Sequence, residues 1–88
     1  MTMSAPTWAD LIARRPELRP KGELSDDACC ANAMNVLRRW QKRMGEPQTG
    51  DDRDRYLMAD AELLKATRSQ DSEVMRRSIG VILDLDIL

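Results

Sequence analysis

The clearest hydrophobic pattern in the chain runs from residue 26 to residue 44 and predicts a helix. Ser25 is a good N-cap, two aspartates follow it at the positive end of the helix dipole, and Gly45 is a natural residue to end the helix. The apolar residues recur at helical spacing in two adjoining stripes, one of Cys30, Met34, Leu37 and Met44 and the other of Cys29, Ala33, Val36 and Trp40. We therefore expect this helix to carry a wide apolar face.

A shorter helix is predicted near the start of the chain. Thr7 and Asp10 have the spacing of a capping box, and an apolar stripe begins at Trp8. Pro16 disfavours helical geometry in the residue before it, so this helix should end after about two turns. The stretch that follows is rich in proline and charge, with Leu18 as its apolar anchor, and predicts an ordered turn.

A third helix is predicted from about residue 51 to residue 68. Its apolar residues form two stripes with Asp60 between them, so the combined face should be weaker than that of the helix at 26–44. The polar residues at 69–72 then break the pattern and offer new N-caps for a segment that leads into Gly80. The two stripes are Leu57, Ala61 and Leu64, and Tyr56, Ala59, Leu63 and Ala66.

Residues 81–88 allow two interpretations. Leucine and isoleucine alternate with Asp84 and Asp86, which is the period of a strand. A helix that continues past Gly80 would instead gather the apolar residues on one side, at a cost of about 1 kcal/mol for the glycine. We favour the helix, because a lone strand leaves its backbone groups unpaired. The expected fold class is all-α: one domain over 1–88, a small bundle of three to four helices, with a strand-like extension at 81–88 as the alternative.

Composition narrows the class of protein. The 88 residues carry 14 basic and 15 acidic side chains, so the net charge of −1 gives no bulk attraction to nucleic acid or to a membrane surface. We find no apolar run of the roughly 20 residues that a membrane span needs, and no signal peptide. The adjacent Cys29 and Cys30 are poorly placed for a disulfide with each other, which favours small buried side chains in a cytoplasmic protein.

Candidate catalytic and metal-binding patterns are weak. The chain has no histidine, which removes the commonest general base and the commonest metal ligand. The aspartates at 51, 52 and 54 might suggest calcium, but Arg53 and Arg55 occupy ligand positions of an EF-hand loop and Tyr56 replaces its glycine. We therefore expect a protein that is not an enzyme and that holds neither a cofactor nor a metal.

The remaining hypothesis is recognition of another protein. An apolar surface larger than one small core needs is normally covered by a partner, and both the C-terminal segment and the helix at 26–44 are unusually apolar. We expect a small interaction module (an adaptor, inhibitor or assembly factor, of the size that phages and plasmids encode) that associates with itself. Its expected partner-binding residues are Val81, Leu83, Leu85, Ile87 and Trp8.

Two alternatives remain open at this stage. The first is a small helical DNA-binding regulator that contacts phosphates through the basic end of the helix at 26–44, namely Arg38, Arg39, Lys42 and Arg43. Base readout would then come from the preceding Asn32 and Asn35, although the N-terminal part of this helix is acidic. The second is a non-catalytic subunit of a larger complex.

Overall fold

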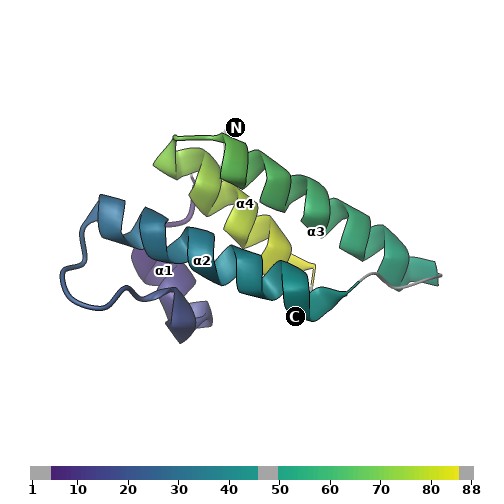
Figure 1. Ribbon diagram of the computed structural model, residues 1–88, viewed down its shortest axis with the longest axis horizontal. Helices are drawn as coiled ribbons and strands as arrows, with labels where there is room; N and C mark the ends of the chain where they lie inside the picture. Colours follow the sequence, from purple (N-terminus) through teal and green to yellow (C-terminus); the bar gives the residue numbers. More distant parts are fainter. Residues whose placement is uncertain (1–4, 46–49, 86–88) are drawn as a thin grey trace.

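The computed structural model describes residues 5–45 and 50–85, which form four α-helices and one short 3-10 helix (Figure 1). No strand occurs in these two ranges, so the all-α prediction is confirmed. The elements in chain order are α1 (Trp8–Arg14), η1 (Pro16–Leu18), α2 (Asp26–Met44), α3 (Gly50–Arg68) and α4 (Ser72–Asp84).

Local capping signals set the helix boundaries. The Thr7 hydroxyl accepts a hydrogen bond from the Asp10 amide, and the Asp10 carboxylate accepts one from the Thr7 amide, so the predicted capping box is present. The Ser25 hydroxyl accepts from the Ala28 amide at 3.1 Å, and α2 covers the predicted residues 26–44. Gly45 has a φ of 62°, a conformation that glycine adopts without strain, and α2 ends there.

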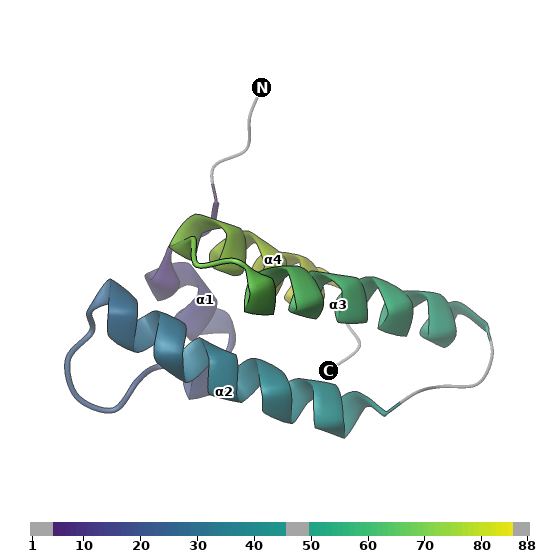
Figure 2. The same ribbon diagram turned by 45° about the horizontal axis from the view of Figure 1, so that its top comes forward.

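The helices are arranged around one cluster of apolar side chains. α3 and α4 run antiparallel and lie side by side in both views (Figures 1 and 2). α4 also contacts α1 and α2, while η1 contacts both α1 and α2. The short α1, which is too short to be stable alone, is therefore held between η1 and α4.

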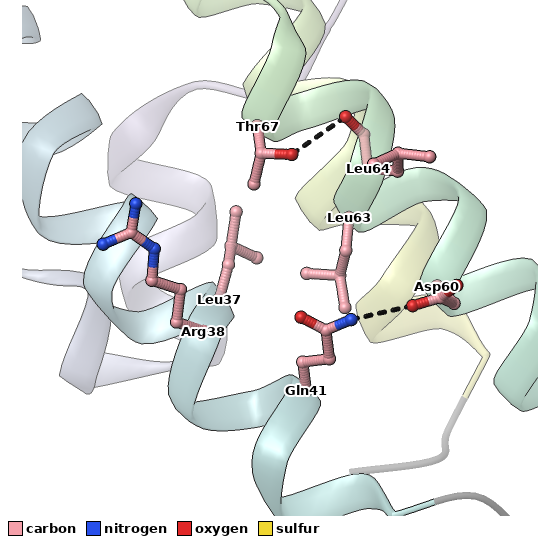
Figure 3. A pocket seen from close by; sticks show the side chains of 7 residues that line it. All are labelled: Leu37, Arg38, Gln41, Asp60, Leu63, Leu64 and Thr67. Atoms are coloured by element: carbon pink, nitrogen blue, oxygen red, sulfur yellow. Dashed lines mark hydrogen bonds between the residues drawn. The ribbon is translucent and has the colours of Figure 1, made fainter.

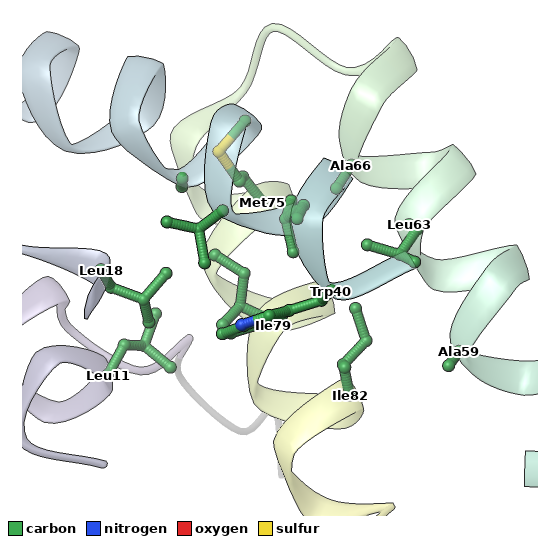
Figure 4. Packing of buried hydrophobic residues seen from close by; sticks show 12 residues of the cluster. Leu11, Leu18, Trp40, Ala59, Leu63, Ala66, Met75, Ile79 and Ile82 are labelled. Carbon is green, nitrogen blue, oxygen red and sulfur yellow. The ribbon is translucent and has the colours of Figure 1, made fainter. Parts of the chain in front are cut away.

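Trp40 occupies the middle of the core. Its side chain has no exposed surface, and Figure 4 shows its ring in the middle of the apolar cluster. The other buried members of this cluster come from all four α-helices and η1: Leu11, Leu18, Ala33, Val36, Leu37, Ala59, Leu63, Ala66, Met75, Ile79 and Ile82.

Two polar contacts attach η1 to α2. The indole N–H of Trp40 donates to Oε1 of Glu17 at 2.9 Å, and the same carboxylate lies within 4.0 Å of the guanidinium groups of Arg15 and Arg43. The Asn32 amide donates to the carbonyl oxygens of Glu17 and Leu18, at 3.1 and 2.8 Å. Without these hydrogen bonds, the polar groups would lose their contact with water on folding and gain no partner in return.

α4 continues through Gly80 and ends at Asp84, which confirms the helical interpretation for residues 81–84. Gly80 is buried, and a Cβ at this position would lie 3.4 Å from Cγ of Pro6. The N-terminal segment thus crosses α4 at its glycine, and Arg76 donates to the Pro6 carbonyl oxygen at 3.0 Å. Residues 86–88, including Ile87 of the strand-like alternative, lie outside the described residues. None of the described helices is long and apolar enough to cross a membrane.

Replacing Glu17 should test the contact that supports the core. Glu17→Ala leaves the buried indole N–H of Trp40 without an acceptor and is expected to lower the free energy of unfolding by about 1–3 kcal/mol. Glu17→Gln keeps an acceptor oxygen and should cost less, because the ion pairs with Arg15 and Arg43 are partly exposed and weak. Urea denaturation followed by circular dichroism measures both, and equal losses in the two variants would contradict this role of the hydrogen bond.

Candidate partner-binding surface

The residues that the sequence predicted for partner binding are mostly used inside the fold. Trp8 is half-buried against the core, and its indole N–H donates to Oδ1 of Asp26 at 2.9 Å. Leu83 and Leu85 are half-buried and also pack against the core. Val81 is 37% exposed, and Ile87 lies outside the described residues. The described part of this set therefore does not form one open apolar patch.

The apolar face of α2 is covered by the rest of the chain. Cys29, Ala33, Val36, Leu37 and Trp40 are buried, and the other stripe is at least half-buried at each position. The expectation that this face exceeds the needs of the core is wrong, because η1, α3 and α4 contact α2 and cover it.

The exposed apolar surface lies instead on α3. Ala59, Leu63 and Ala66 face the core, and the stripe on the opposite side of the helix faces solvent. This outer side, which we call the α3 apolar face, has exposed fractions of 48% at Leu57, 53% at Met58 and 48% at Leu64, with the exposed Ala61 among them. Large apolar side chains gathered in this way on one helix are typical of an interaction site.

A small cavity of about 70 Å³ lies between α2 and α3, beside this face (Figure 3). Leu37 and Leu63 line it from the two helices, and the Gln41 amide donates to Oδ1 of Asp60 at 2.8 Å across it. Small-molecule sites usually measure about 300–1,000 Å³, so this cavity is too small to be one. Leu64 borders both the cavity and the outer surface, where it adjoins Lys65 and Arg68. Arg38 and Thr67 complete the lining of the cavity.

The basic cluster at the end of α2 lies on the surface. Arg38, Arg39, Lys42 and Arg43 are all exposed, and Arg43 lies 3.8 Å from the Glu17 carboxylate. Within residues 5–45 and 50–85, no carboxylate lies within 4.0 Å of the other three cations. Of the two asparagines considered for base readout, Asn32 is bonded to the backbone of η1 and Asn35 is exposed. The structure thus brings the cations together and leaves Asn35, which is exposed one helical turn before Arg38 and Arg39, as the remaining asparagine beside them.

One polar junction was missed by the sequence analysis. Oδ1 of Asp26 accepts from the Ser72 hydroxyl at 2.6 Å as well as from Trp8, and so connects α1, α2 and α4. These two hydrogen bonds, Ser72 first, and the nearby charge of Arg76 hold the pKa of Asp26 below its ordinary value. The sequence showed Asp26 only as an acidic residue at a helix N-terminus, a signal that Asp27 shares.

Neither cysteine has the environment of a reactive thiol. Both are free, and burial raises the pKa of each, with the charge of Asp26 adding to the effect at Cys29. Within the described part of the chain, no group of three metal-ligating side chains lies close enough together to hold a metal ion. No protein-family model, curated protein or solved structure matches the chain.

The variant Asp26→Asn tests the polar junction, because the stability that the junction contributes should depend on pH. A carboxylate whose pKa is lowered on folding stabilises the fold above its unfolded-state value of about 3.9, and this stabilisation disappears as the pH falls through the folded-state pKa. We therefore expect the wild-type Tm to exceed that of Asp26→Asn at pH 7 and the difference to vanish in acid. Asp27→Asn is the control, because it removes the same charge from the same helix turn. Identical pH profiles for the two variants in thermal melts would contradict the junction.

Proposed function

We propose that the protein is a non-catalytic interaction module, an adaptor, inhibitor or assembly factor, that binds another protein through the α3 apolar face. The observation that carries this proposal is the half-exposure of Leu57 and Leu64 on the side of α3 that points away from the core, with the half-exposed Met58 at its edge. The same helix supplies Ala59, Leu63 and Ala66 to the core, so the exposed side chains are attached to an ordered element.

The chemistry of this face suits a protein partner. Covering exposed apolar area contributes about 25 cal/mol for each Å² removed from water. Because the side chains project from a helix that is already formed, little backbone entropy is lost on binding. Lys65 and Arg68 border the apolar residues, which gives the apolar centre and charged rim that are typical of protein interfaces.

The residues proposed from the sequence enter this proposal in different ways. Val81 remains available as an exposed apolar side chain on α4. Trp8, Leu83 and Leu85 support the fold, and a partner could reach only their exposed parts. A non-catalytic subunit of a larger complex would use the same α3 face. We also propose a cytoplasmic location, which the two free thiols support.

The DNA-binding alternative is supported by the four exposed cations of α2. They could contact phosphates, and such binding would weaken steeply with salt. The engagement of Asn32 by η1 leaves this alternative with Asn35 alone, of the two asparagines, for base readout. The α3 apolar face is therefore the stronger basis for a function.

The double variant Leu57→Lys/Leu64→Lys tests the proposed function. The lysine stems still cover the neighbouring side chains, so the helical fold should be kept, while the charges oppose burial in an interface. The tagged chain is used to co-purify partners from the native source, and each partner is then titrated in purified form against wild type and variant. We expect at least a tenfold loss of affinity, since roughly 1.4 kcal/mol is sufficient for that factor.

Leu24→Lys is the matched control. Leu24 is 56% exposed, comparable with the α3 leucines, but it precedes α2 and does not belong to the α3 apolar face. Its substitution should leave the affinity unchanged. A partner that binds the double variant as tightly as wild type would overturn the proposed function.

A further inference from the structure

The outer side of α3 has the spacing of a helix-pairing seam. Asp54, Leu57, Ala61, Leu64 and Arg68 follow one another at intervals of three, four, three and four residues, and all five are exposed. This is the interval pattern of the contact positions in a coiled coil, which places the five side chains along one side of a helix. The seam runs through the α3 apolar face and has a charged residue at each end, Asp54 at one and Arg68 at the other.

The two ends of the seam carry opposite charges at equal distances from its centre. Asp54 precedes Ala61 by seven residues and Arg68 follows it by seven, which is about 10.5 Å along the helix axis in each direction. When two such helices lie antiparallel and are related by a two-fold axis at Ala61, each Asp54 meets Arg68 of the other copy. A parallel pair would instead place aspartate against aspartate and arginine against arginine, which is unfavourable.

The apolar residues fit the same arrangement. Leu57 lies four residues before Ala61 and Leu64 three residues after it, so in the antiparallel pair each Leu57 lies within one residue, about 1.5 Å along the axis, of Leu64 of the other copy. Ala61 then faces Ala61, and its small side chain allows the two helices to approach closely. From this juxtaposition we infer that a second copy of this chain binds the α3 apolar face, with the two α3 helices antiparallel and centred on Ala61.

This inference rests on the proposed function and names its partner. A seam of five residues is smaller than the roughly 20–30 residues a side of a standard interface. The dimer should therefore be weak, with a Kd on the order of 100 μM, and the exposed Asp54–Arg68 pairs should make it weaker at high salt.

Charge reversal at the ends of the seam provides the test. Sedimentation equilibrium of the full chain over about 10 μM to 1 mM covers the expected Kd range. Asp54→Arg and Arg68→Asp should each weaken the dimer by roughly tenfold, because each variant turns two attractive pairs into repulsive ones. The double variant Asp54→Arg/Arg68→Asp restores opposite charges and should restore the wild-type Kd. Arg55→Asp, an exposed position on α3 outside the seam, is the control and should have no effect.

A cross-link can locate the two-fold axis independently of these charges. In a Cys29→Ala/Cys30→Ala background, Ala61→Cys should form a disulfide-linked dimer on mild oxidation, because a residue on the axis lies opposite its own copy. Such a bond requires Cα atoms about 4.4–6.8 Å apart. Arg55→Cys in the same background should remain mostly monomeric.

The outcomes separate this inference from the proposed function. A chain that is monomeric throughout the concentration range overturns the inference that the partner is a second copy. A dimer that survives the single charge reversals, or that the double reversal fails to restore, overturns the antiparallel arrangement centred on Ala61. Neither result affects a different partner that is lost with Leu57→Lys/Leu64→Lys. If Leu57→Lys/Leu64→Lys still binds every partner, including a second copy of the chain, the proposed function itself is overturned.

Discussion

The fold depends on the burial of Trp40 together with a hydrogen-bond acceptor for its indole N–H. Trp40 is the largest fully buried side chain in the described part of the core, and an indole without a partner there would be unfavourable. The acceptor, Glu17, belongs to η1, so the ring is satisfied only when η1 is docked on α2. Because a single residue separates η1 from α1, docking of the turn also positions α1 against the core. One donor–acceptor pair thus couples the N-terminal third of the chain to the central helix.

The arrangement of α3 explains how apolar surface comes to be left outside. Two of the three residues that α3 buries are alanines, so α3 approaches α4 closely and contributes little side-chain volume to the core. Its larger side chains, Leu57, Met58 and Leu64, are on the other side or at its edge. Leu63 is the exception, and it fills the space next to Leu37. The helix therefore gives mainly small side chains to the core and keeps most of its large apolar side chains on the surface.

Short-range signals in the sequence were sufficient to predict the helices. They were not sufficient to predict how the helices pack against one another. The capping box at Thr7, Ser25 before α2 and Gly45 after it act within a few residues, so sequence alone located these ends. The periodicity of α3 revealed two stripes but not which one faces the core, since that choice depends on how closely α4 can approach alanine. In the same way, the pairing of Glu17 with Trp40 and of Ser72 with Asp26 joins residues 23 and 46 positions apart, which no local pattern encodes. Excess apolar surface was consequently expected on α2 and in the C-terminal segment, with Trp8 of α1 in the partner-binding set, whereas the exposed large apolar side chains gather mainly on α3.

The contacts between the two ends of the described chain have a consequence for the order of folding. Arg14 with Asp84, and Arg76 with the Pro6 carbonyl, each join residues 70 positions apart. The α3–α4 hairpin can form from neighbouring segments, whereas these contacts require the chain to close a loop of nearly its whole length. Pairings of long sequence separation are the slow ones in small proteins. We therefore expect the docking of α1 on α4 to be a late event in folding and an early opening in native-state hydrogen exchange.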